Sequence, residues 1–202
     1  MASSSHGVRN LFNFFWLCGK LKHLKRTGWV NHKVSEPETV SGHMYRMAMM
    51  SFLFGSKSNP SVDRDRCIRM ALVHDLAESI VGDLTPSSGV SKEEKHSREK
   101  AAMEQIQTYL PQEVGKEMYD LWLEYETGQT AEARVVKDLD KFDMIFQAFE
   151  YEKAESREGE LQQFFDSTKG TFVSPEVKEW VSELYSMRQD ALGPSDYPHP
   201  SN

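Results

Sequence analysis

Residues 67–83 read CIRMALVHDLAESIVGD, and this stretch indicates both the fold and the chemistry of the chain. Apolar residues surround a His74-Asp75 pair, and Glu78 follows at a spacing of four from the histidine. An aspartate at 63 or 65 can cap the start of a helix here, and Gly82 stands in the position favoured after a helix. The pattern predicts one largely buried helix over 67–81 that carries a histidine and two carboxylates.

The remaining periodic segments also predict helices, and none alternates as a strand would. The stretch 91–94, SKEE, has the form of a capping box, and Pro111 marks the end of the helix that it opens. Loops are expected at 26–29 and 83–90, and further helices at 11–24, 41–54, 114–125, 130–154, 161–168 and 175–188. The sequence predicts an all-α fold, a single-domain helical bundle over 11–190, with a flexible N-terminus at 1–10 and a disordered tail at 191–202.

Composition limits the classes of partner. The chain has 202 residues, of which 39% are hydrophobic, which is enough for one buried core. With 24 Lys and Arg against 31 Asp and Glu, its formal charge is −7. Such a chain has no general attraction for nucleic acid polymers or an anionic membrane. A small phosphate ester would need local positive charge, which a bound cation can supply.

Two features bear on the compartment. Cys18 and Cys67 are the only cysteines, each within an apolar helical pattern, so a reducing intracellular setting is expected rather than a disulfide scaffold. No apolar run approaches the roughly 20 residues that span a bilayer. The first 35 residues lack acidic side chains, which is typical of a mitochondrial transit peptide. An apolar face between Leu11 and Leu24 favours an ordinary core helix instead, and we expect a cytoplasmic protein.

The polar residues of the apolar helices suit a metal ion. His74 and Glu78 share one face of a helix, and Asp75 projects about 100° away from His74. His43 and Asp140 lie on other predicted helices and can point into the same bundle. Buried carboxylates need a partner, and one cation satisfies several. A mixed nitrogen and oxygen set suits Mn, Co, Fe, Zn or Mg, and open positions would hold water and substrate.

Each of these residues also has a simpler interpretation. A histidine on an apolar helix face is more often a hydrogen-bonded core residue than a ligand, and a lone His-Asp pair occurs by chance in many sequences. Spacing alone does not choose among Asp138, Asp140 and Asp143 as the carboxylate of that helix. Glu78 can be a solvated residue of a last helical turn, and Asp83 a turn former.

The order of these motifs resembles that of the HD superfamily of metal-dependent phosphohydrolases. Residues 37–43 (PETVSGH), 74–78 (HDLAE) and 81–83 (VGD) look like the 5′-deoxynucleotidase branch, over about 11–168 of the chain. The resemblance implies the all-α HD fold and metal-dependent hydrolysis of deoxyribonucleoside 5′-monophosphates to deoxynucleoside and phosphate. It also implies a homodimer and a small-molecule nucleotide as substrate.

By position within the family motifs, His43, His74, Asp75 and Asp140 look like the ligands of the principal metal, with Mn, Co or Mg the expected ion. One departure concerns the residue before the first histidine. The family usually has an acidic residue there, whereas this chain has Gly42. The resemblance therefore leaves the ligand in place but puts its orientation in doubt.

The same resemblance assigns further roles around the predicted metal. Glu78 resembles the catalytic glutamate that orients or deprotonates the attacking water, and Asp83 a second acidic residue acting on water or on a second cation. In the eukaryotic branch Glu78, Asp83 and the Leu84 carbonyl look like ligands of a second metal. Trp29 falls where bacterial relatives place a tryptophan against the sugar, although plain core packing is the alternative. Those relatives carry arginine directly before it, and Arg26 is expected to hold phosphate here from three positions away.

Two other functions compete with this one. Hydrolases of triphosphates or signalling dinucleotides need more basic residues than the motif region offers. A non-catalytic helical binding module with a vestigial site should have lost some of the ligands, whereas all are present, together with Glu78 and Asp83.

Overall fold

The computed structural model describes residues 2–55 and 62–192 and confirms the all-α prediction. Within these ranges the regular elements are all helical, and the β-type pairing is one isolated bridge between Lys25 and Thr39. The chain forms two compact units, Met1–Val136 and Lys137–Asn202. No helix in the described part of the chain is long and apolar enough to cross a membrane.

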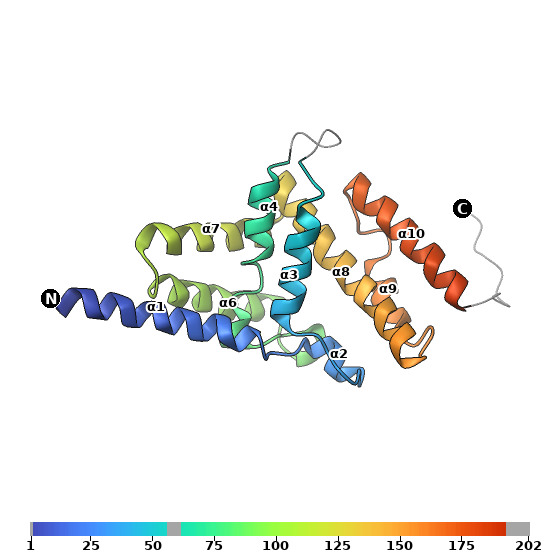
Figure 1. Ribbon diagram of the computed structural model, residues 1–202, viewed down its shortest axis with the longest axis horizontal. Coiled ribbons are helices and arrows are strands. Elements are labelled where there is room, and N and C mark those ends of the chain that lie inside the picture. The colour runs from blue at the N-terminus through green and yellow to red at the C-terminus, as the bar shows by residue number, and fades with distance from the viewer. Residues whose placement is uncertain (1, 56–61, 193–202) are drawn as a thin grey trace. The chain divides into compact units, whose positions relative to one another are not determined.

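The first unit is a set of helices packed in pairs (Figure 1). Helix α3 contacts α4, α4 contacts α7, α6 contacts α7, and the short α5 contacts both α1 and α6. The largest fully buried side chains of this unit include Trp29, Met47, Met70, Met103 and Trp122. Burying such a side chain contributes about 1.5–3 kcal/mol. The elements are α1 (Ala2–Leu21), α2 (Thr27–Asn31), α3 (Val40–Ser51), α4 (Arg64–Ala71), α5 (Glu78–Val81), η1 (Pro86–Ser88), α6 (Lys92–Gln107), α7 (Gln112–Thr127) and the first residues of α8 (Ala131–Glu155).

The predicted helix starts are confirmed at their capping residues. The Asp63 carboxylate accepts the amide hydrogen of Arg66 at 3.1 Å and caps α4. The Ser91 hydroxyl accepts the amide hydrogen of Glu94 at 3.1 Å and caps α6. Each cap satisfies an amide that the first helical turn leaves without a helical partner.

The predicted continuous helix over 67–81 is wrong. Helix α4 ends at Ala71, residues 72–77 form turns, and α5 begins at Glu78. Several backbone bonds in the turns span three residues, as from the Leu76 amide to Val73 O at 2.9 Å, although the His74 amide still reaches back four residues to Met70 O. The ring of His74 forms a hydrogen bond with the Ala71 carbonyl. In an α-helix that carbonyl would accept the amide hydrogen of the residue four positions later. The histidine side chain thus competes with the helix at the position where the helix stops.

The N-terminal region also differs from expectation. The predicted loop at 26–29 contains most of α2, a five-residue helix. Helix α1 begins at Ala2, so residues 2–10, expected to be flexible, are helical in the structure. The tail expected at 191–202 lies outside the described residues except for 191 and 192, which end α10.

The second unit holds most of α8, α9 (Gln162–Thr168) and α10 (Pro175–Leu192). Arg188 from α10 donates to the Glu152 carboxylate on α8 at 2.7 and 2.9 Å, and both side chains are buried. The same guanidinium lies 3.8 Å from the ring centre of Phe165. A buried ion pair needs such complete hydrogen bonding to offset the loss of hydration. This network fixes α10 on α8 within the unit.

Candidate metal centre

His74 is held in the tautomer that a metal ligand requires. Its Nδ1 lies 2.9 Å from the carbonyl oxygen of Ala71. Because a carbonyl only accepts, Nδ1 carries the proton and the neutral ring presents a lone pair at Nε2. That Nε2 is buried and makes no hydrogen bond of ordinary geometry to any residue that the structure describes. A backbone carbonyl behind the ring is the usual device for orienting a metal-binding histidine.

Asp75 brings the two histidines to one point. Its Oδ2 lies 3.2 Å from His74 Nε2 and 3.8 Å from His43 Nε2, and the three ligand atoms lie within 4.8 Å of one another. Donors that share an ion through bonds of about 2.1 Å lie about 3.0–3.4 Å apart. A lone pair and a carboxylate oxygen repel each other at such distances unless a proton or a cation lies between them. The His74–Asp75 distance falls in this range and the His43–Asp75 distance lies slightly above it, so the donor types and their convergence suit a divalent metal.

The placement of His43 follows from the start of α3. Thr39 is the N-cap of this helix, and its hydroxyl accepts the amide hydrogen of Gly42 at 3.1 Å. The His43 amide bonds to Thr39 O at 3.1 Å, which puts the ring in the first turn, where it is fully buried. The rings of His43 and His74 are 5.4 Å apart and inclined at 70°. The capped turn therefore presents His43 to Asp75 from a second element.

The charge of Asp75 is maintained by its neighbours. Its side chain is 19% exposed, and the guanidinium of Arg26 lies 3.5 Å from Oδ2. Burial opposes ionisation, but the two histidines, in the protonated form that they can take without a metal, and Arg26 outweigh it and lower the pKa of Asp75 to about 2. The carboxylate is thus ionised, as a ligand must be, over the whole physiological range of pH.

Glu78 opens α5 three residues after Asp75 and is only 4% exposed. Its Oε2 is buried and has no hydrogen-bond partner within the described residues. Burial, followed by the charges of Asp75 and Asp83, raises the pKa of Glu78 well above its ordinary value. A solvated residue of a last helical turn, the simpler interpretation, would be exposed. The carboxylate is instead buried near the charges of Asp75 and Asp83, and its role as an acid or base stays a prediction.

Asp83 and Leu84 lie in the loop after α5 and each bind a neighbouring element. Asp83 Oδ2 accepts the Thr27 amide at 2.6 Å, and its carbonyl accepts the Thr27 hydroxyl at 2.8 Å, so Asp83 also secures the start of α2. The Leu84 carbonyl accepts Lys95 Nζ at 3.0 Å. This ammonium lies 3.4 Å from Glu99. Because the Leu84 carbonyl already binds an ammonium, it is a poorer candidate ligand for a second cation than the Glu78 carboxylate.

Sequence reasoning missed Lys95. Burial opposes its charge, but Glu99 and the three acids Glu78, Asp75 and Asp83 raise the pKa of Lys95. It is therefore a cation beside the acidic cluster. The capping box put it in the first turn of α6, but nothing local to the sequence indicated that it reaches the loop eleven residues earlier.

Arg26 and Trp29, the expected substrate residues, are both close to Glu38. The Trp29 indole N–H donates to Glu38 Oε1 at 2.9 Å, and Arg26 Nε lies 3.8 Å from the same oxygen. Trp29 is only 1% exposed, which favours its core role over direct contact with a sugar. Arg26 stays near the candidate metal centre through Asp75.

Asp140 is part of α8 in the second unit, and its role as the fourth ligand stays a prediction. One rival is already engaged there: Asp138 Oδ2 accepts the amides of Val173 and Ser174 at 2.8 and 2.7 Å, just before α10. Asp143 is fully buried on the same helix. Asp140 and Asp143 therefore remain as the two candidates on α8 for the fourth ligand.

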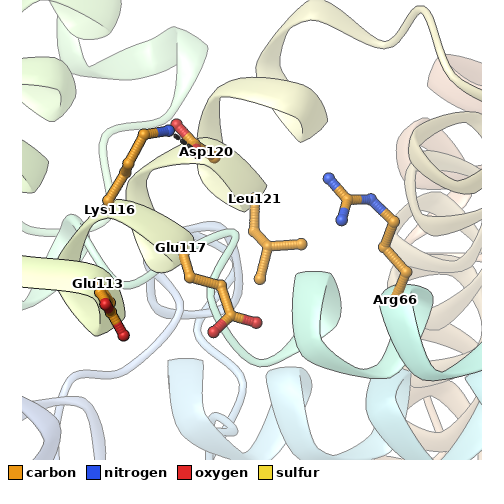
Figure 2. Close-up of a pocket in the computed structure, with 6 residues that line it drawn as sticks. All are labelled: Arg66, Glu113, Lys116, Glu117, Asp120 and Leu121. Carbon is orange, nitrogen blue, oxygen red and sulfur yellow. Dashed lines mark hydrogen bonds and ion pairs between the residues drawn. The ribbon is translucent and has the colours of Figure 1, made fainter.

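A hollow of about 280 Å³ lies between α4 and α7 and contains none of the predicted site residues (Figure 2). Arg66 comes from α4, and the other lining residues come from α7. Its charges are paired locally, as between Lys116 and Asp120 and between Arg66 and Glu124. We assign no ligand to it.

The chain is similar to proteins of one family. A model of the HD domain matches residues 18–179. A structure from Pyrococcus furiosus, described as a conserved hypothetical protein, is 30% identical with a TM-score of 0.71, covering 87% of this chain and 99% of that one. A predicted metal-dependent phosphohydrolase from Magnetospirillum magnetotacticum is 25% identical with a TM-score of 0.70, covering 91% and 95%. The chain belongs to the HD-domain family.

Within this family the chain is similar to the 5′-deoxynucleotidase HDDC2 of Homo sapiens, with 52% identity over 92% of this chain and 89% of the human protein. Similarity at this level extends over both units of the structure.

Proposed function

We propose that the protein is a metal-dependent 5′-deoxynucleotidase, which hydrolyses deoxyribonucleoside 5′-monophosphates to deoxynucleoside and phosphate. The observation that carries this proposal is the convergence of His43, His74 and Asp75, with the proton of His74 held on Nδ1 by Ala71. The names of the family relatives at about half identity supply the substrate class.

The residues divide the work of the reaction. His43, His74 and Asp75, with Asp140 as the fourth ligand, would hold the principal cation, for which Mn, Co or Mg is expected. When bound, the cation lowers the pKa of a water ligand and neutralises phosphoryl oxygens. Glu78 orients the attacking water and takes its proton while the water oxygen attacks phosphorus and the bond from phosphorus to O5′ breaks. The departing O5′ then takes a proton from Glu78 or from solvent to form the deoxynucleoside hydroxyl. Its raised pKa makes the ionised carboxylate of Glu78 a stronger base than an ordinary glutamate.

Three further groups complete the proposed site. Arg26 offers guanidinium donors to the phosphate from beside Asp75. Asp83 and the Leu84 carbonyl are the expected companions of Glu78 at a second cation. The contact of the Leu84 carbonyl with Lys95 means that its part in such a site requires Lys95 to move away.

The direct test is phosphate release from a panel of deoxynucleoside and ribonucleoside monophosphates and triphosphates, with Mn²⁺, Co²⁺ or Mg²⁺ added to metal-free protein. We expect turnover of the deoxynucleoside monophosphates, loss of turnover in EDTA, and loss in Asp75→Asn. Asp65→Asn is the matched control, since Asp65 is an exposed aspartate on the preceding helix. Turnover of triphosphates alone would favour the rival hydrolase. Metal binding without any turnover would indicate a vestigial site.

We also infer that the protein is a homodimer, as the family resemblance implies. Helix α1 exposes four large apolar side chains at helical spacing, Val8, Phe12, Phe15 and Trp16. Several exposed apolar side chains of this size on one helix support an interface with a second copy of the chain. Light scattering should give a dimer for the parent and a smaller species for Trp16→Lys. A monomeric parent would refute the inference.

A further inference from the structure

Glu38 connects the segment before α3 to the loop that carries Arg26. The backbone carbonyl of Glu38 accepts the Arg26 amide at 3.1 Å, and the Val40 amide donates to Leu24 O at 2.9 Å. Lys25 Nζ adds a bond to Pro37 O at 2.7 Å. The two segments are therefore joined as a short ladder, which holds Glu38 opposite Arg26.

The side chain of Glu38 interacts with both expected substrate residues, through a hydrogen bond with Trp29 and an ion pair with Arg26. Its Oε1 accepts the Trp29 indole N–H at 2.9 Å and lies 3.8 Å from Arg26 Nε, and the side chain is only 13% exposed. A carboxylate oxygen that accepts one hydrogen bond still carries negative charge, so Oε1 can bind the indole and attract the guanidinium together. Removing the charge would leave a poorly hydrated guanidinium with one fewer anionic neighbour.

Arg26 lies between two carboxylates. Its Nε edge faces Glu38, while Nη1 lies 3.5 Å from Asp75 Oδ2, the oxygen that also meets both histidines. A direct guanidinium–carboxylate bond is about 2.7–2.9 Å long. Arg26 is thus held short of full contact with Asp75. Loss of the Glu38 charge would shift the balance of attraction on the guanidinium towards Asp75, this predicted ligand.

We propose that Glu38 is a positioning residue, which holds the guanidinium of Arg26 at the edge of the candidate metal centre. Held there, Arg26 keeps donors for the substrate's phosphate and leaves Asp75 Oδ2 available to the metal. The proposal rests on the proposed function for its kinetic consequences, but its effects on metal and phosphate binding do not require turnover.

Glu38→Gln is the principal variant. The amide keeps an oxygen for the Trp29 indole and nearly the same volume, but it removes the charge that faces Arg26. We expect unchanged helicity, Mn²⁺ affinity weakened about 10- to 100-fold by titration calorimetry, and weaker inhibition by inorganic phosphate. A misplacement of about 1 Å costs about 100-fold in kcat/KM. Glu36→Gln, an exposed change of the same charge two residues earlier, is the control and should match the parent.

A double-mutant cycle with Arg26→Gln separates positioning from support of the fold. If Glu38 acts through Arg26, adding Glu38→Gln to Arg26→Gln changes neither Mn²⁺ affinity nor phosphate inhibition further. Fully additive losses, or parental Mn²⁺ and phosphate binding in Glu38→Gln, would overturn the proposal. Should Glu38→Gln not fold, Glu38→Asp retains the charge at a longer distance, and parental binding by that variant would equally overturn it. A parent that binds Mn²⁺ and phosphate but hydrolyses no deoxynucleotide would reject the proposed function alone.

Discussion

The buried carboxylate of Glu78 should make the metal-free protein less stable than its neutral variant. At 4% exposure, with Oε2 lacking a hydrogen bond among the described residues, its ionised form has little solvation to replace that of water. Leaving a buried polar group unsatisfied costs about 1–3 kcal/mol. Glu78→Gln removes the charge at similar volume, so metal-free Glu78→Gln should be more stable than the parent by about 1–3 kcal/mol at pH 8. For a chain of this size each kcal/mol corresponds to about 2–4 °C in Tm.

The pH dependence has a definite sign. The folded-state pKa of Glu78 is raised, so the native state binds the proton more tightly than the unfolded chain does. The stability that this proton contributes is complete below the unfolded pKa of about 4.3 and is lost as pH rises through the folded value. The advantage of Glu78→Gln should therefore disappear towards pH 4.

The assay is thermal unfolding in EDTA between pH 4.5 and 8.5, with Glu104→Gln as an exposed control on α6. An advantage that is absent at pH 8, or that persists unchanged on acidification, would refute the assignment of Glu78 as a buried charge. The same variant should retain Mn²⁺ and yet lose about 10²–10⁴-fold in turnover, because its amide cannot accept the proton.

Three further predictions concern single residues. Asp140→Asn should abolish Mn²⁺ binding and activity with the helical circular dichroism preserved, whereas loss in Asp143→Asn with activity retained in Asp140→Asn would identify the other carboxylate as the ligand. Asp138→Ala should keep Mn²⁺ and lose about 1–3 kcal/mol of unfolding free energy, because two amides before α10 lose their acceptor. Trp29→Ala should lower the free energy of unfolding by about 3–5 kcal/mol, as removal of a buried tryptophan does. Trp29→Phe should leave the deoxy-to-ribo ratio of kcat/KM unchanged. A ratio that falls towards one would instead support contact between Trp29 and the sugar.

The long helices could be predicted because their signals are local. Capping residues such as Asp63 and Ser91 act on amides three residues away, and the apolar stripes of α7 and α8 repeat over several turns. The break after Ala71 could not be predicted, since it depends on a side chain competing with the backbone for a carbonyl. Periodicity counts His74 as one more helical position and does not register that competition.

The candidate site could also be predicted only in part. Motif resemblance indicated His43, His74 and Asp75 together, and the structure brings these three to one point. Glu38 and Lys95 were missed, because each acts through contacts that cross nine or more residues and belong to no periodic pattern. The predicted loop at 26–29 was wrong, since Trp29 is a buried residue of helix α2.

The turns at residues 72–77 have a consequence for amide hydrogen exchange. Bonds that span three residues have poorer geometry than those of an α-helix, so this segment should open at lower cost than α4. A cation held by His74 and Asp75 would have to be released before the turns could open. At a free concentration of 100 times the dissociation constant, this linkage slows opening about 100-fold. Exchange of the turn amides would then report metal occupancy residue by residue.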